Sequence, residues 1–187
     1  MQHLFTIVLL LLRPAISFTQ NIDKLILTSK GFISKKTHHD YIILKLENQT
    51  KETLYKKSLI CFNSIYKSPK DVISKVDNEL ITIHEVARNC IRRKRHEFNM
   101  DYSLTLRFKD GKIKIEQPHF ELTSYNRTKQ TLHLRWDKFS FYGSDLGIYG
   151  RKNKIKSPQA KKDLEHFFNE YIEKITINLS NSDSDNW

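Results

Sequence analysis

The stretch that decides the fold is "YSLTLRFKDGKIKIE", residues Tyr102 to Glu116. Apolar side chains stand at every second position of its first half: Tyr102, Leu104, Leu106 and Phe108. Successive strand side chains point to opposite faces, so this alternation predicts a half-buried strand. Asp110-Gly111 predicts a tight turn because Gly accepts the positive φ that such a turn needs. Ile113 and Ile115 continue the alternation, so the stretch predicts an antiparallel hairpin with one apolar face.

Upstream segments predict a strand, a helix and two more strands. Residues 40–47 alternate, with Ile42, Leu44 and Leu46 on one face. Residues 48–67 predict a helix that Asn48 or Thr50 caps and that ends at Ser68-Pro69. Its stripe at helical spacing is Leu54, Ser58, Cys61, Phe62 and Ile65. Residues 71–77 predict a short strand or extended link, and residues 79–91 predict a longer strand.

The segments that follow this hairpin differ in how clearly their sequences predict a structure. Residues 120–158 form a variable connection that holds the aromatic residues Trp136, Phe139, Phe141 and Tyr142. These aromatic rings could form a stacking platform, but such a cluster more often covers a small core. Residues 158–179 predict an amphipathic helix with an apolar stripe: Leu164, Phe167, Phe168, Tyr171, Ile172, Ile175 and Leu179. Residues 181–187 are a polar tail.

The element order is strand, helix, four strands and helix. It predicts an α+β domain over residues 40–180 with its core in residues 41–122. We expect a single antiparallel sheet with two helices on one face.

The N-terminal residues indicate an address outside the cytoplasm. Residues 4–12 are almost wholly apolar, and Ala15 and Ser17 are spaced as small residues before a cleavage point. We therefore expect a signal peptide over residues 1–17, although its start lacks Lys and Arg; the alternative is a buried strand or helix. The apolar run is too short to span a membrane, which takes roughly 20 residues. Residues 18–39 then form a lead-in of uncertain structure.

The expected export decides which partners the net positive charge of the protein could bind. The net charge is +11, and removal of Arg13 with the signal peptide leaves +10. An exported protein rarely meets structured nucleic acid, so no nucleic-acid partner is expected. The expected partners are an envelope protein or an anionic envelope surface, such as anionic lipid, lipopolysaccharide or acidic glycan.

Four consecutive cations are the candidate contacts with such a surface: Arg92, Arg93, Lys94 and Arg95. The strand pattern places them at a hairpin end, projecting into water, where mutual repulsion should keep them from stabilising the fold. The simpler interpretation is a solvated turn. Lys45, Arg107 and Lys114 on the open sheet face are possible additional contacts.

Three segments resemble a known family. They are the helix entry "KETLYKKSLICFNSIY" at 51–66, the strand "DVISKVD" at 71–77 and the hairpin "LRFKDGKIK" at 106–114. Together they resemble the domain of unknown function with a TBP-like fold found in exported proteins of Bacteroidetes. The resemblance covers residues 41–122 and departs at "VDNELITIHEVARNC", where such domains often carry a Gly turn. It implies a periplasmic or envelope address and a TBP-like fold, but neither an activity nor site residues. A TBP-like fold does not imply DNA binding.

The sequence contains no catalytic motif that we recognise. It has no G-x-S-x-G and no Gly-rich phosphate loop, and its eight His residues lack the spacing of a helical metal motif. We therefore expect no enzyme, no metal and no cofactor. The sequence favours a binding or interaction module that uses the open sheet face. The alternative is a small-ligand carrier or enzyme with a pocket between the sheet and residues 120–158.

Cys61 and Cys90 could form a disulfide in an oxidising compartment. Cys61 lies on the apolar helix stripe, however, where a free Cys behaves as a small hydrophobic residue. We therefore favour two free thiols.

Overall fold

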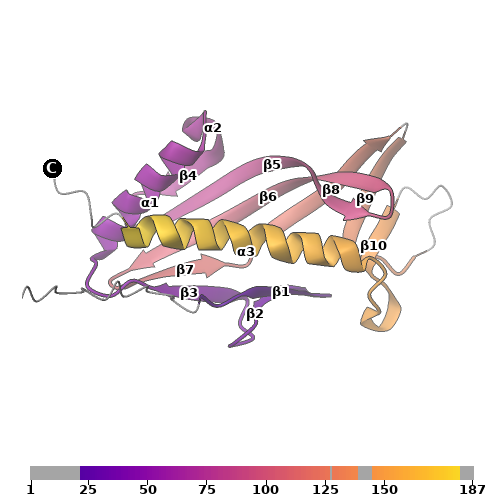
Figure 1. Ribbon diagram of the computed structural model, residues 1–187, viewed down its shortest axis with the longest axis horizontal. Coiled ribbons are helices and arrows are strands. Elements are labelled where there is room, and N and C mark those ends of the chain that lie inside the picture. Colours follow the sequence, from indigo (N-terminus) through magenta and orange to yellow (C-terminus); the bar gives the residue numbers. More distant parts are fainter. Residues whose placement is uncertain (1–21, 127, 139–144, 182–187) are drawn as a thin grey trace, which may run out of the picture.

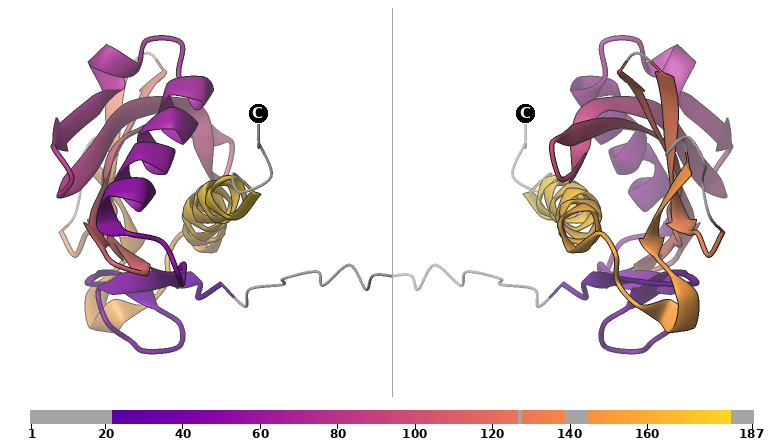
Figure 2. Two further views of the ribbon diagram at one scale, coloured as in Figure 1. Left: turned by 90° about the vertical axis from the view of Figure 1, so that its left-hand side faces the viewer. Right: turned by 90° about the vertical axis from the view of Figure 1, so that its right-hand side faces the viewer.

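The computed structural model describes residues 22–126, 128–138 and 145–181. The predicted signal peptide, residues 182–187 of the polar tail and the aromatic residues Phe139, Phe141 and Tyr142 lie outside them. Two long helices lie on the same side of a large sheet that curves around them (Figures 1 and 2). None of the helices in the described part of the chain is long and apolar enough to cross a membrane.

More residues lie in strands than in helices. The N-terminal part holds β1 (Leu25–Thr28), β2 (Gly31–Ser34), β3 (Tyr41–Lys45), α1 (Lys51–Ile65), α2 (Pro69–Val72) and β4 (Ile73–Val76). The central part holds β5 (Leu80–Arg93), β6 (His96–Lys109), β7 (Lys112–Glu116), β8 (His119–Asn126) and β9 (Thr128–Arg135). The chain then forms β10 (Asp145–Tyr149), a short 3-10 turn (Arg151–Asn153) and α3 (Pro158–Asn181).

The long strand β6 organises the eight-stranded sheet. It pairs with β5 along most of its length, with β8 near its start and with β7 near its end. The strand order is β10-β9-β8-β6-β5-β4, and β7 and β3 extend the sheet from the far end of β6. β1 and β2 form a separate two-stranded sheet.

The predicted hairpin at Asp110-Gly111 is confirmed and also fixes the start of α1. Gly111 has φ +70°, and its N–H donates to the Gln49 carbonyl at 2.8 Å. The Asp110 carboxylate accepts from the Lys51 N–H at 2.8 Å, while the Thr50 hydroxyl accepts from the Thr53 N–H. Free N–H groups in the first turn of a helix need such acceptors. One turn therefore joins β6 to β7 and caps α1.

The core lies between the helices and one face of the sheet. Alternate residues of β5, β6 and β7 are buried there against apolar stripes of α1 and α3. Aromatic rings join the layers, with centroids 5.1 Å apart for Phe32 and Phe168 and 5.6 Å apart for Tyr102 and Phe168. Each large side chain buried in this way contributes about 1.5–3 kcal/mol before entropy is counted.

The predicted α+β class is confirmed, but the predicted arrangement is too simple. Residues 120–158 contribute β8, β9 and β10, and β10 runs parallel to β9, so the sheet is neither four-stranded after α1 nor wholly antiparallel. β8 and β9 escaped prediction because their buried positions include Ser124 and offer few apolar residues beyond Leu122 and Leu132. Ile65 is also 43% exposed, because α1 ends there.

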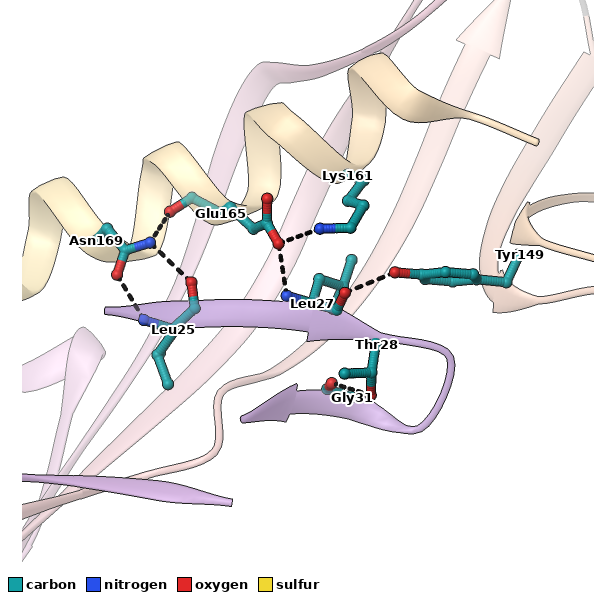
Figure 3. Close-up of polar contacts among 8 residues, drawn as sticks. All are labelled: Leu25, Leu27, Thr28, Gly31, Tyr149, Lys161, Glu165 and Asn169. Carbon is teal, nitrogen blue, oxygen red and sulfur yellow. Dashed lines mark hydrogen bonds and ion pairs between the residues drawn. The ribbon is translucent and has the colours of Figure 1, made fainter. Parts of the chain in front are cut away.

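The lead-in predicted as structurally uncertain forms the β1–β2 hairpin, and side chains of α3 hold it (Figure 3). The Asn169 amide acts as a substitute strand: its Oδ1 accepts from the Leu25 N–H at 2.8 Å, and its Nδ2 donates to the Leu25 carbonyl at 2.9 Å. Glu165 accepts from the Leu27 N–H at 2.7 Å, and the Tyr149 hydroxyl donates to the Leu27 carbonyl at 2.6 Å. These side chains satisfy the outer edge of β1.

Candidate functional site

Strand pairing brings three lysines together at one end of the open sheet face. Lys45 of β3 lies directly opposite Lys112 of β7, and Lys112 lies directly opposite Lys109 of β6. All three are exposed. Side chains directly opposite one another have Cβ atoms about 4.5–5.5 Å apart, and like charges in such pairs destabilise a sheet. The row therefore has an electrostatic cost that an anionic partner would offset.

A second row beside it adds two more cations and an exposed aliphatic side chain. Ile43, Lys114 and Arg107 are paired across β3, β7 and β6. Arg107 Nε lies 2.6 Å and Lys114 Nζ 3.7 Å from the same oxygen of Glu116. Lys114 Nζ also lies 4.6 Å from the centre of the Tyr41 ring, a cation–π distance. We call Lys45, Arg107, Lys109, Lys112 and Lys114 the basic corner.

The run Arg92 to Arg95 is only partly the solvated turn that was predicted. Arg92 donates to the Asp163 carboxylate of α3 from its N–H at 2.9 Å, from Nε at 3.0 Å and from Nη2 at 2.8 Å. Arg93 Nε donates to the Ser157 hydroxyl at 2.9 Å. The expectation that the run projects into water and adds nothing to stability is therefore wrong for these two residues. Lys94 and Arg95 are exposed at the turn.

The contact with Arg92 changes the pKa of Asp163. Burial favours its neutral form, but hydrogen bonds from the Arg92 side chain and N–H and from Gln159 outweigh burial and lower the pKa of Asp163 below its ordinary value. Asp163 is 8% exposed while Arg92 is 58% exposed. The pair fastens the tip of the β5–β6 hairpin to the first turns of α3.

The structure does not bring the two predicted basic sites together. The run lies where β6 begins and the basic corner lies where β6 ends. At about 3.3 Å per residue the 14-residue strand is roughly 43 Å long if straight. Lys45, Arg107 and Lys114 therefore belong to one surface, and Arg92–Arg95 to another.

Tyrosine hydroxyls form a polar link between the helices and the sheet that sequence analysis missed. Tyr102 donates to the Glu85 carboxylate at 2.6 Å, and the hydroxyls of Tyr66 and Tyr171 are hydrogen-bonded to each other. Burial raises the pKa of Tyr66 to about 12 and raises the pKa of Tyr102 and of Tyr171. Hydroxyls that stay protonated and are already paired with one another hold α1, α3 and the sheet together.

The remaining candidates from the sequence are the two cysteines, the aromatic residue Trp136 and a possible metal site. Cys61 and Cys90 are free thiols whose pKa values are raised by burial. Trp136 stacks on His133, with ring centroids 4.6 Å apart. Within residues 22–126, 128–138 and 145–181, no three His, Cys, Asp or Glu side chains are grouped to hold a metal ion.

A groove of about 550 Å³ runs along β3, whose five residues form one wall. Its remaining lining residues come from the start of the described chain and from the link before β3: Ile22, Asp23, Lys36, Thr37 and His39. The pocket that the carrier or enzyme alternative requires would lie beside residues 120–158 instead. That alternative stays a prediction.

These features define an α+β domain of TBP-like fold with a basic corner on its open sheet face. Residues 41–123 match the family described as "Domain of unknown function (DUF4468) with TBP-like fold". The resemblance expected from the sequence is therefore confirmed over that segment. A search of curated proteins finds no match.

Two solved structures share the fold. A TBP-like protein from Parabacteroides distasonis aligns with a TM-score of 0.56 and 12% identity, over 75% of this chain and 91% of that one. A DUF4468 family protein from Bacteroides ovatus aligns with a TM-score of 0.50 and 11% identity, over 78% and 88% of the two chains. At this identity the likeness shows the fold alone.

Proposed function

We propose that this protein is an exported, non-catalytic binding domain that attaches through its basic corner to an anionic surface of the cell envelope. The observation that carries the proposal is the row Lys45, Lys112 and Lys109, three like charges on neighbouring strands. Nearby, Glu116 already interacts with Arg107 and Lys114, and Asp110 accepts from the Lys51 N–H. The three lysines of the row are exposed, so an external anion can reach them.

The expected attachment is weak and reversible. A cation near an anionic membrane contributes about 1 kcal/mol, and screening shortens its reach to about 8 Å at physiological salt. The five cations of the basic corner could therefore hold the protein on a surface at low salt and release it as salt rises. Ile43, which is 38% exposed between them, adds an apolar contact.

Two observations support the envelope address. The apolar run and small residues of positions 4–17 are typical of a signal peptide. Residues 41–123 match the DUF4468 family, and the resemblance of the sequence to that family implies an exported protein.

Co-sedimentation with vesicles tests the proposal. The mature protein is mixed with vesicles containing anionic phosphatidylglycerol and, separately, with neutral phosphatidylcholine vesicles, at low and physiological salt. The variant Lys45→Gln, Lys109→Gln, Lys112→Gln should lose most of its sedimentation with the anionic vesicles.

A matched control removes the same charge elsewhere. Lys56, Lys70 and Lys162 are exposed and lie on the helices rather than on the open sheet face. Their replacement by Gln should leave most of the sedimentation in place. Equal losses in the two triple variants would show that net charge alone drives binding and would overturn the proposal.

A further inference from the structure

A bulge in β5 bends the far end of the β5–β6 hairpin toward α3 (Figures 1 and 2). Ala87 lies opposite Met100 and Ile91 lies opposite Phe98, so β5 takes four steps where β6 takes two. Extra residues on one strand of a pair bend that strand and increase its twist. The bend carries the turn at Lys94 to the helix side of the sheet, where the hairpin tip forms its ion pair with α3. The turn therefore lies on the other side of the sheet from the basic corner.

Hydrogen bonds join this hairpin tip to the loop that follows β10. Arg93 Nε donates to the Ser157 hydroxyl at 2.9 Å, and that hydroxyl donates to the Gly147 carbonyl of β10 at 3.1 Å. The loop is itself tied to β10, because the Lys156 N–H donates to the Ile148 carbonyl at 2.8 Å. The hairpin tip and the loop therefore form one end of the molecule.

Six exposed cations lie at this end. Among residues 22–126, 128–138 and 145–181, no carboxylate forms an ion pair with any of the six. Cations gathered on two short segments create a positive potential that attracts anions from solution. We call this set the basic end: Lys94, Arg95, Arg151, Lys152, Lys154 and Lys156.

Two of these lysines occupy backbone positions that suit lysine poorly. Lys94 has φ +55° and Lys152 has φ +52°. This left-handed region brings Cβ close to the following carbonyl oxygen, and Gly or Asn occupies it at a lower cost. The other described residues with positive φ are Gly31, His38, Asn48, Asn78, Asn89, Gly111 and Asn153. Lysine at both positions therefore supplies a positive charge where Asn would give a more stable backbone.

We propose that the basic end binds an acidic polysaccharide, an extended polymer that carries carboxylates at regular intervals. The cations lie on two segments, 92–97 and 150–157, so a chain of spaced charges can contact more of them than one small anion can. Neither segment contains Phe, Tyr or Trp. Single-stranded nucleic acid is a less suitable partner, because its bases usually stack on aromatic rings. A flat membrane that contacts the basic corner lies on the other side of the sheet.

The inference does not depend on attachment through the basic corner, because the two surfaces share no residue. The variant Lys45→Gln, Lys109→Gln, Lys112→Gln should therefore bind the polysaccharide as the parent does. Loss of vesicle binding and loss of polysaccharide binding are separate results, and each proposal can fail without the other.

The test uses a fluorescently labelled oligogalacturonate and the full mature chain. Fluorescence anisotropy should show saturable binding at low salt that weakens as salt rises, because salt screens the charges. The double variant Lys94→Asn, Lys152→Asn should bind at least tenfold more weakly. Its midpoint of urea unfolding should rise, because Asn tolerates the left-handed region better than Lys does. A loss of binding by a more stable protein cannot come from unfolding.

The control variant Lys56→Gln, Lys70→Gln removes two exposed charges from α1 and α2 and should keep most of the affinity. The proposal is overturned if the parent does not bind the oligogalacturonate, or if the two double variants lose affinity equally. It is also overturned if a single-stranded oligonucleotide of equal charge, or phosphatidylglycerol vesicles, bind the parent more tightly than the oligogalacturonate does and lose that binding in Lys94→Asn, Lys152→Asn.

Discussion

Replacement of Asp163 by Asn should loosen the tip of the β5–β6 hairpin from α3. The carboxylate accepts three hydrogen bonds from Arg92 and one at 2.7 Å from the Gln159 amide. Asn keeps the shape of the side chain and one acceptor oxygen. It removes the negative charge and turns an NH₂ group toward these donors.

The magnitude follows from the burial of the two partners. A hydrogen bond to a charged group contributes about 1.5–3 kcal/mol, but contacts with an exposed partner are screened by solvent. Arg92 is exposed and Asp163 is buried, so we expect Asp163→Asn to lower the free energy of unfolding by about 2 kcal/mol. Thermal unfolding should then shift by about 4–8 °C in a chain of this size.

The pH dependence separates this account from a packing defect. Because the folded-state pKa of Asp163 is lowered, its contribution is present above the unfolded pKa of about 3.9 and is lost as pH falls through the folded value. Urea unfolding should show a larger difference between parent and Asp163→Asn at pH 7 than near pH 3, because the contribution of the carboxylate falls as pH drops below the unfolded pKa. The exposed Asp101→Asn is the control and should differ little from the parent at pH 7. A difference that is the same at both pH values would refute the reasoning.

Three further predictions concern separate parts of the chain. Asn169→Ala leaves the N–H and C=O of Leu25 without their partners and should lower the free energy of unfolding by about 2–3 kcal/mol, measured by urea denaturation; no change would contradict the role of Asn169 as a substitute strand. Thiol titration of the denatured, unreduced protein should find Cys61 and Cys90 both reactive, and in the folded protein both should react more slowly because burial raises their pKa values; absence of reactive thiols would establish a disulfide. Protein isolated from its native host should lack about residues 1–17 by intact mass, and a full-length product would contradict the export proposal.

The parts of the fold that follow local periodicity could be predicted from the sequence. The β6–β7 hairpin, α1 and α3 each contain a regular apolar pattern, and Gly111 and Thr50 mark the turn of the hairpin and the start of α1. The missing Gly in "VDNELITIHEVARNC" is also explained, because Asn78 takes the positive φ, +56°, between β4 and β5. Asn tolerates that conformation better than most residues.

Contacts between distant residues could not be predicted in this way. Asn169 reaches Leu25 across 144 positions and Asp163 reaches Arg92 across 71. Both are single polar side chains on a helix, and nothing in their neighbours distinguishes them from ordinary surface residues. For this reason the sequence predicts neither the β1–β2 hairpin nor the contact between Arg92 and Asp163.

The basic corner could be predicted from the sequence only in part. Alternation placed Lys45, Arg107 and Lys114 on the open face, and the same pattern places Lys109 and Lys112 there. The direct opposition of Lys45, Lys112 and Lys109 depends on the register of three strands. Only the paired strands show that the like charges form a row.

Protection of lysines from acetylation by bound vesicles tests the central claim most directly. The protein is briefly acetylated with and without phosphatidylglycerol vesicles, and modification at each lysine is read by mass spectrometry. Attachment through the basic corner predicts that Lys45, Lys109 and Lys112 become protected while Lys162 does not. Protection centred on Lys94, or equal protection of all these lysines, would contradict it.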